Sequence, residues 1–395
     1  MNSKIVKEKL AQAVALLKEQ ELDMWLVFAR ETTLTPEPCL DLIAGMDFTW
    51  HSAFIVSRSG AKIAIVGRFD AGNVAALGAY TQVIPYDQSI RPALLEVVQK
   101  LNPATIAVDY SVSDPSADGL SYGLWSYLQE TFAKTPFATR FVSAEKFVAS
   151  LRGRKSKTEQ ARVRAAIRTT EKMYKQVGAW LAPGRTEKEI AGRMTAAREA
   201  LELGTAWDQA YCPIVNAGPN SAAGHGAPGN HRVKRGQLVH MDFGVRQNGF
   251  SSDLQRMWYV REKGEKRAPE DVLRAWEACW GALLAGAEKL KPGVQGWEVD
   301  AAARAYLVKA GYPEYQHALG HHLGRVAHDG STTLGPKWDR YGQTPFGVVE
   351  VDNIFTLELG AFVPRRGSIG LEEDVLVTKS GIEWLSTPQK KIWLV

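Results

Sequence analysis

A repeated pattern in the second half of the chain constrains its fold more than any other feature. Residues 181–190 contain Leu-Ala-Pro-Gly followed by Glu-Ile, and residues 290–299 repeat this arrangement as Leu-Lys-Pro-Gly and Glu-Val, 109 positions later. An amphipathic helix is predicted before each Pro-Gly pair and a second helix after it. So many matched positions indicate a duplication. Two α/β halves related by a pseudo-twofold axis predict one curved sheet between them, whose concave face can gather ligands from both halves.

Two aspartates lie in one predicted hairpin. Asp242 and Asp253 flank Asn248-Gly249, which is a strong short signal for a turn between two strands. The acids lie at unequal distances from this turn, so a bulge or a twist is expected to bring both to one ion. Alternatively, both aspartates serve as turn or capping residues. Asp242 follows an apolar run, and a buried aspartate without a cation is costly, which favours a role as a ligand.

Histidines are concentrated further along the chain. Four of the eight histidines fall within residues 317–328, which is too dense for ordinary core packing. Imidazole binds metal ions or shuttles protons near neutral pH. Two strand-like stretches, 355–360 and 369–377, each carry glutamates, and we predict Glu358 and Glu373 as further ligands. Alternation along a strand leaves open that Glu358 faces solvent. Four carboxylates and one imidazole suit a pair of hard divalent cations.

These residues resemble the pita-bread metallopeptidases, a family that includes methionine aminopeptidases, Xaa-Pro aminopeptidases, prolidases and the metal-free relative creatinase. The resemblance covers residues 155–395. It is strongest to the Xaa-Pro branch, because three accessory histidines also match. The fold implied is α/β (α+β), with a pita-bread catalytic domain of two duplicated halves around a curved antiparallel sheet, preceded by a smaller creatinase-like N-terminal domain. The five matching ligands are Asp242, Asp253, His321, Glu358 and Glu373, and the accessory histidines are His225, His317 and His328.

The resemblance implies hydrolysis of the Xaa-Pro bond in dipeptides or short peptides by a hydroxide that bridges two divalent metal ions. Manganese is the first expectation, with cobalt, zinc or iron as alternatives. In the family, the glutamate that matches Glu358 acts as the base. By the same resemblance, Asp253 and Glu373 would bridge the two ions. Asp242 would complete the coordination of one ion, and His321 and Glu358 that of the other. The three accessory histidines, His225, His317 and His328, would bind the substrate and stabilise the oxyanion.

The chain also departs from the Xaa-Pro pattern. Leu371 stands where an arginine is common, Leu359 where a proline is common, and Gln255 where a threonine is common. His322 replaces a usual glycine and Asp329 a usual glutamate. These positions support ligands and tune activity. Two alternatives therefore stay open: a hydrolase or lyase of a small metabolite on the same metal-binding scaffold, and a binding protein without catalysis.

The length of 395 residues, 45% of them hydrophobic, exceeds what one core usually holds and predicts two domains, residues 1–150 and 155–395. Strand-like runs at 24–28, 52–56, 61–66 and 105–109 predict an open mixed sheet with flanking helices in the first domain. The family resemblance implies that this domain restricts access to the site and supports a homodimer.

Between the domains, the basic run 151–157 predicts a solvated linker leading into a helix at about 158–181. A net charge of +5 with both signs scattered gives no sign of a nucleic-acid partner. Three cysteines are too few and too scattered for a disulfide framework, and no signal peptide or membrane span is recognised, so a cytoplasmic enzyme is expected. The stretch 331–350 is either a loop over the site or an ordinary surface connection.

Overall fold

The computed structural model describes residues 3–221 and 226–395, and the chain divides into two compact units, Met1–Arg152 and Gly153–Val395. The first unit contains a six-stranded mixed sheet with the strand order β4-β3-β2-β1-β5-β6. β1 pairs antiparallel with β2 and parallel with β5, so the predicted open mixed sheet is confirmed. The strands are β1 (Met24–Ala29), β2 (Ser52–Ser57), β3 (Lys62–Gly67), β4 (Gln82–Tyr86), β5 (Ile106–Val108) and β6 (Phe141–Ser143).

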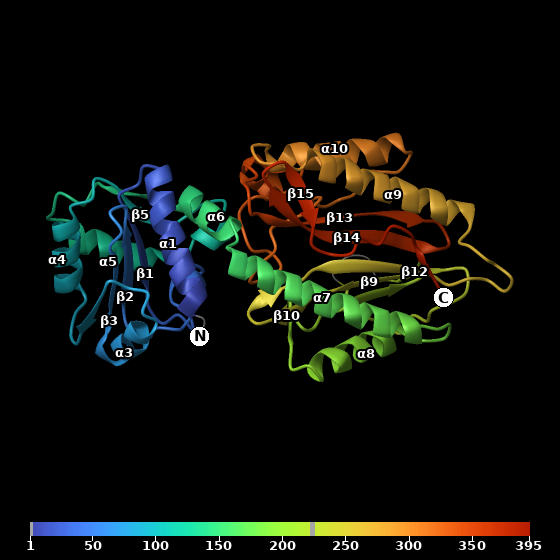
Figure 1. The fold of residues 1–395 in the computed structure, drawn as a ribbon, viewed down its shortest axis with the longest axis horizontal. Coiled ribbons are helices and arrows are strands. Elements are labelled where there is room, and N and C mark those ends of the chain that lie inside the picture. The colour runs from blue at the N-terminus through green and yellow to red at the C-terminus, as the bar shows by residue number, and fades with distance from the viewer. Residues whose placement is uncertain (1–2, 222–225) are drawn as a thin grey trace. The chain divides into compact units, whose positions relative to one another are not determined.

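Helices cover both faces of this sheet (Figure 1). Along β1, Trp25 and Val27 belong to one hydrophobic cluster, and Leu26 and Phe28 belong to another on the opposite face. A strand buried on both faces reads as a continuous apolar run, which is why this part of the sequence shows no alternation. The helices are α1 (Ser3–Glu19), α2 (Leu40–Ile43), α3 (Arg68–Ala76), α4 (Arg91–Leu101), α5 (Tyr122–Phe132) and α6 (Glu145–Gly153).

The second unit is built on a seven-stranded sheet with the path β13-β14-β12-β9-β8. β15 (Gly381–Trp384) pairs with β14, and β16 (Trp393–Leu394) pairs in parallel with β12. All strand pairs along the main path are antiparallel, as predicted. The strands of that path are β8 (Ile214–Ala217), β9 (Leu238–Phe243), β12 (Leu254–Tyr259), β13 (Ile354–Val363) and β14 (Gly367–Thr378).

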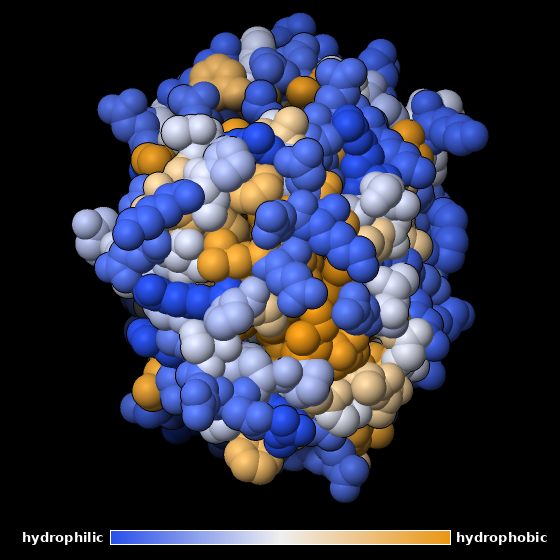
Figure 2. Space-filling view, turned by 90° about the vertical axis from the view of Figure 1, so that its left-hand side faces the viewer, coloured by the Kyte–Doolittle hydropathy of each residue, from blue (hydrophilic) through white to orange (hydrophobic). Residues whose placement is uncertain are grey.

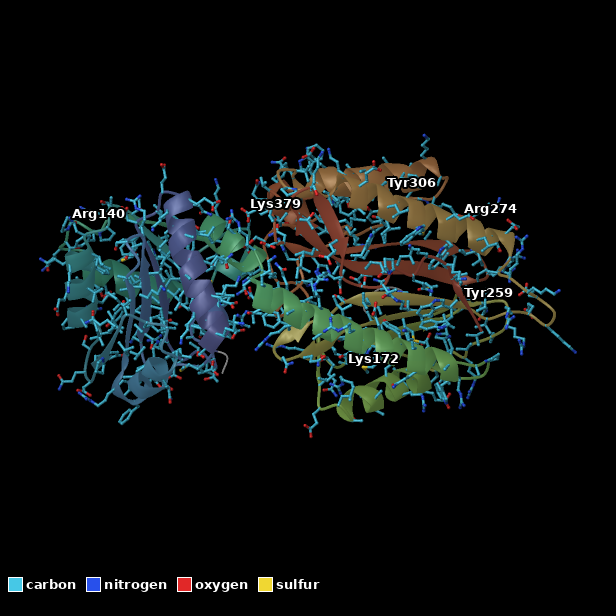
Figure 3. All side chains as sticks on the ribbon, in the orientation of Figure 1. Arg140, Lys172, Tyr259, Arg274, Tyr306 and Lys379 are labelled. Atoms are coloured by element: carbon cyan, nitrogen blue, oxygen red, sulfur yellow. The ribbon has the colours of Figure 1, made fainter. Side chains whose placement is uncertain are left out.

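Two helix pairs flank this sheet. α7 (Lys157–Trp180) and α8 (Glu187–Glu199) lie beside β9 and β12, while α9 (Glu270–Lys289) and α10 (Gly296–Lys309) lie beside β13 and β14 (Figure 1). In Figure 3, Lys172 marks the first pair, and Arg274 and Tyr306 mark the second.

The two helix pairs repeat in detail. A capping box at Thr186 and Glu189 starts α8, and a capping box at Gln295 and Glu298 starts α10. Each box satisfies two backbone N–H groups at the start of its helix. The glycines before them, Gly184 and Gly293, have φ values of 89° and 91°. The predicted duplication therefore extends to the conformation of single residues.

The hairpin that carries the two aspartates turns at Asn248 and Gly249, with φ values of 52° and 79°. It continues through β10 (Val245–Gln247) and β11 (Phe250–Ser251), and β10 also pairs with β7 (Gly204–Thr205). The same register holds on both sides of the strand break, so no residue is inserted, and of the two expected alternatives, a bulge or a twist, the bulge is absent. A Cβ on Gly244 would lie 1.9 Å from the carbonyl oxygen of Ser252, so the two chains cross closely where the strands twist.

The basic run 151–157 is not a solvated linker. Residues up to Gly153 belong to α6, and Ser156 caps α7. Lys155 is buried, and its Nζ lies 2.7 Å from Oδ2 of Asp329. A buried ammonium needs such a partner.

Figure 2 shows one face of the molecule, on which hydrophilic residues surround a patch of hydrophobic residues near the centre. Within the described ranges 3–221 and 226–395, none of the helices combines the length and the hydropathy that crossing a bilayer requires. The stretch 331–350 contains two short 3-10 helices, η2 (Asp339–Tyr341) and η3 (Thr344–Phe346).

Candidate metal centre

The centre of the second sheet gathers buried and half-buried acids around one imidazole. Ligand atoms of Asp253, His321 and Glu372 all lie within 4.8 Å of one another. Nε2 of His321 lies 3.9 Å from Oδ2 of Asp253, 3.8 Å from Oε1 of Glu358 and 4.0 Å from Oε1 of Glu372. These side chains come from the β11–β12 junction, the loop before β13, β13 itself and β14.

The strand register explains why these residues meet. Gln255 on β12 is opposite Asp242 on β9 and opposite Glu372 on β14, and Glu372 is opposite Glu358 on β13. Directly opposite residues in a sheet point to the same face. A single row of side chains therefore crosses four strands, and Asp253 lies two residues before Gln255 on the same face.

Glu373 is a correction to the sequence-based ligand set. Its carboxylate accepts hydrogen bonds from Arg256 at 3.1 and 3.2 Å and from Ser386 Oγ and the backbone of Gln389. Successive side chains of a strand point to opposite faces, so Glu373 lies on the face away from His321 and Glu372 takes the expected place. From the sequence alone, Glu372 and Glu373 could not be distinguished as candidate ligands. The strand register distinguishes them, because Glu372 is directly opposite Glu358.

The acids in the row are strongly perturbed. Burial, followed by repulsion from Glu358, raises the pKa of Asp242 well above its usual range. Burial and neighbouring carboxylates also raise the pKa of Asp253 and of Glu372 well above theirs. Burial raises the pKa of Glu358 to about 7. Four like charges in a desolvated cluster favour protons or a bound cation.

His321 is prepared to act as a ligand. Its Nδ1 lies 3.1 and 3.0 Å from the carbonyl oxygens of His322 and Ala327, and carbonyl oxygens only accept. Nδ1 therefore carries the proton, and the lone pair of Nε2 points toward the acids. Burial, with a further contribution from His328, lowers the pKa of His321 to about 3, which keeps the ring neutral.

The remaining histidines take different places. The ring of His328 is exposed and meets the ring of His321 edge to face at 4.2 Å between centroids. His317 is also exposed, and its Nδ1 donates to the carbonyl oxygen of Ala318 at 2.7 Å. His322 is buried against Phe355, with ring centroids 4.1 Å apart. The predicted His225 lies outside the described residues.

The donor set fits divalent cations. Oδ1 of Asp242 and Oδ1 of Asp374 are buried without a hydrogen-bond partner. In the described part of the chain, no lysine or arginine forms an ion pair with the side chains of Asp242, Asp253, Glu358 or Glu372. Buried carboxylates require compensation, and oxygen ligands with one imidazole suit manganese, cobalt, iron or zinc. Asp242, Asp253, His321, Glu358 and Glu372 would hold the ions.

Three polar residues beside the acids went unrecognised as a group in the sequence. Gln255 donates from Nε2 to Glu358 and Glu372, and its Oε1 faces His240, which in turn contacts Asn216. Gln255 was noted only as a departure from a family pattern. His240 lies two residues before Asp242, and alternation within β9 was the signal that could have placed both on one face.

This sheet and its acid–imidazole centre define a metal-dependent hydrolase of the pita-bread type. A family model described as metallopeptidase family M24 matches residues 161–379, more than half of the chain, and the chain belongs to that family. The chain is therefore a metallopeptidase, as the sequence resemblance predicted.

Individual relatives agree with this assignment. The Xaa-Pro dipeptidase of Pyrococcus furiosus is 27% identical over 272 residues, which cover 68% of this chain and 74% of the relative. The solved structure of an Xaa-Pro dipeptidase from Bacillus anthracis has a TM-score of 0.75 at 22% identity, covering 99% of this chain and all of that chain. An X-Pro aminopeptidase structure from Thermotoga maritima has a TM-score of 0.71 at 23% identity, covering 98% and 99%. These two structures support the fold of both units.

Proposed function

We propose that this protein uses two divalent cations to hydrolyse the Xaa-Pro bond of dipeptides or short peptides, and that these cations are manganese ions. The observation that carries the proposal is the row formed by Asp242, Glu372 and Glu358, with Asp253 and His321 beside it. The similarity to Xaa-Pro dipeptidases supports the substrate class. When bound, such cations polarise a peptide carbonyl and lower the pKa of water.

The protein's own residues would then orient the substrate and move protons. Glu358 lies on the exposed side of the row, with about a quarter of its side chain accessible, and its Oε1 would accept a proton from the attacking water and return it to the leaving nitrogen. The proline nitrogen carries no N–H of its own, so a proton must be supplied to it. His328, exposed beside His321, and His317 would bind the peptide and stabilise the developing oxyanion.

The test is proline release from Xaa-Pro dipeptides and Xaa-Pro-Xaa tripeptides. The protein is first stripped of metal by a chelator and then reloaded with Mn, Co or Zn. We expect metal-dependent release, and we expect Glu358→Gln to lower kcat about 100-fold or more, as loss of a general base does. Glu383→Gln, a change on an exposed strand residue of the same unit, is the matched control. Proline release that survives complete metal removal would refute the proposal.

A hydrolase or lyase of a small metabolite on the same scaffold remains the second candidate. Xaa-Pro enzymes commonly have an arginine two residues before the final ligand. If Glu372 is that ligand, the position is Gly370, and if Glu373 is, it is Leu371, so neither assignment supplies the arginine. Tight metal binding without release of proline from any peptide of the panel would favour this candidate.

A homodimer in the cytoplasm, with the first unit restricting access to the site, is also part of the proposal. The first unit exposes several large apolar side chains, and the proposal takes some of them to be covered in the dimer. Light scattering of the purified protein gives its mass directly, and a monomer at micromolar concentration would remove this part. The exposed residues are Leu34, Phe69, Val112 and Tyr122.

A further inference from the structure

The amide of Gln255 connects the two glutamates of the metal centre. Its Nε2 lies 3.3 Å from Oε2 of Glu358 and 3.2 Å from Oε2 of Glu372. The other oxygen of each glutamate, Oε1, faces Nε2 of His321 at 3.8 and 4.0 Å. An ionised carboxylate only accepts hydrogen bonds, so the amide nitrogen engages one oxygen of each glutamate and leaves the other beside His321.

Two further side chains fix the orientation of this amide. Nε2 of His240 lies 2.9 Å from Oε1 of Gln255, and Nδ1 of His240 lies 3.0 Å from the side-chain oxygen of Asn216. Because the amide oxygen of Gln255 accepts, His240 donates from Nε2, and the amide nitrogen of Gln255 faces the acids. Burial lowers the pKa of His240 and keeps the ring neutral, so Nδ1 then accepts, and this arrangement requires the Asn216 amide to turn its nitrogen toward Nδ1. A polar chain therefore runs from β8 through β9 to β12 and ends on the two glutamates, and it disfavours a flip of the Gln255 amide.

Gly370 provides the space for this chain. A Cβ at that position would lie 2.5 Å from Oε1 of Gln255 and 2.6 Å from Nε2 of His240, closer than a Cβ approaches such atoms. Any other residue at 370 would displace the ends of both side chains. The position of the Gln255 amide therefore depends on the absence of a side chain at Gly370.

We propose that Gln255 is a positioning residue that reserves one oxygen of each glutamate for a cation beside His321 and competes with a second cation for the other oxygen. The inference rests on the proposed function, because it requires the acid row to bind divalent cations. The first cation would find Oε1 of Glu358 and of Glu372 already oriented together with Asp253. A second cation, for which Asp242 would be a ligand, would compete with the amide for Oε2 of the two glutamates.

The test is a titration of the metal-free, full-length protein with Mn²⁺, following free Mn²⁺ by electron paramagnetic resonance and heat by calorimetry. Gln255→Met keeps the length of the side chain but cannot donate. We expect the dissociation constant of the second equivalent to fall about tenfold, the scale of a lost hydrogen bond to a charged group, while that of the first does not fall. Gln247→Met, in the hairpin and bonded to Thr169, is the matched control and should leave both constants unchanged.

A second variant protects the test against a folding defect. Gly370→Ala displaces the amide of Gln255 by steric contact alone. It should also lower the dissociation constant of the second Mn²⁺ relative to that of the first. Thermal unfolding of the metal-free variants identifies any that do not fold. Equal weakening of both constants, or an unchanged ratio in both variants, would overturn the inference.

The outcomes also separate this inference from the proposed function. If the parent binds Mn²⁺ and the ratio narrows in the variants, Gln255 has the proposed role even when no Xaa-Pro peptide is cleaved. If the parent binds no Mn²⁺ at all, both the inference and the proposed metal-dependent activity fail.

Discussion

Each unit of this protein buries a cluster of carboxylates, and the two clusters differ in how their charge is compensated. In the first unit, Glu37 and Asp109 share a hydrogen bond; burial raises the pKa of Glu37 well above its usual range and that of Asp109 to about 6, and the charge of Arg152 opposes both shifts. Trp25 donates to Asp109 at 2.7 Å, and the backbone of Leu40 donates to Glu37 at 2.9 Å. Oε1 of Glu37 and Oδ2 of Asp109 have no donor among the described residues, so a proton shared by the two acids and the charge of Arg152 provide the compensation in this cluster.

The acid row of the second unit receives hydrogen bonds from Gln255, but no lysine or arginine among the described residues forms an ion pair with it. Arg256 is a buried arginine that follows Gln255 directly, but it pairs with Glu373 on the opposite face of the sheet. Burial and potential metal-binding residue types are common to both clusters, since Cys39 also lies beside Glu37 and Asp109. The comparison teaches that an internal counter-charge, more than burial, separates a structural acid cluster from a candidate metal centre.

The largest expected difference is between two adjacent glutamates. Glu372→Gln removes a carboxylate from the row. Loss of a residue that only supports a ligand lowers metal affinity about 10- to 100-fold, and we expect the loss of Mn²⁺ affinity here to be larger. Glu373→Gln should leave Mn²⁺ affinity near that of the parent and lower the free energy of unfolding, because Arg256 loses a charged partner. Metal titration and urea unfolding of both variants check this. The reverse pattern would restore Glu373 as the ligand.

Removing the internal cation of the first cluster should be the next largest effect. Arg152→Met leaves buried acids without their compensating charge, and we expect a loss of about 3–5 kcal/mol in unfolding free energy. Adding Glu37→Gln and Asp109→Asn should recover part of that loss. Arg68→Met is the control, because Arg68 forms an exposed pair with Asp87. Comparable behaviour of Arg152→Met and Arg68→Met in urea unfolding would contradict the contrast between the clusters.

Neutralising one acid of the second cluster should change stability in opposite directions with and without metal. In the presence of chelator, Asp253→Asn removes a repulsive buried charge and should raise the unfolding free energy by about 1 kcal/mol or more. In excess Mn²⁺ the same variant should be less stable than the parent, because it loses binding energy. Urea unfolding under both conditions gives the two signs. Destabilisation in both conditions would show that the row is compensated by the protein.

The smallest effect per unit of change concerns the pH dependence of the first cluster, where a single group titrates. Burial, with repulsion from Asp109, raises the pKa of Glu37 well above 4.5, so the folded state holds a proton that the unfolded state releases. The parent should therefore lose stability as pH rises above about 4.5, by at most about 1.4 kcal/mol per pH unit for this group. Glu37→Gln is neutral throughout and escapes this loss. Its unfolding free energy relative to the parent should increase from pH 5 to pH 8, and a constant difference would contradict the shared proton.

Much of the fold could be predicted from local patterns. Strands β1, β2, β3 and β5 are apolar runs, whereas β4 and β6 were missed because they are short and partly exposed. Helix α7 was expected within a residue of its bounds, and the structure shows that Ser156 and Glu159 form a capping box at its start, a signal that the sequence analysis did not use. Lys155, in contrast, was expected in solvent, because its partner Asp329 is far away in the chain and only packing brings them together.

The duplicated architecture and the residue types of the site could be predicted from sequence, because Pro-Gly pairs, turns and apolar runs are local signals, and because four acids with one imidazole restrict the chemistry. Tertiary structure alone decided which glutamate joins the row, because a shift of one residue reverses the face of every side chain in a strand and the register depends on partners over 100 residues away. It also decided that Gln255, His240 and Gly370 act together, since they meet only where β9, β12 and β14 lie side by side.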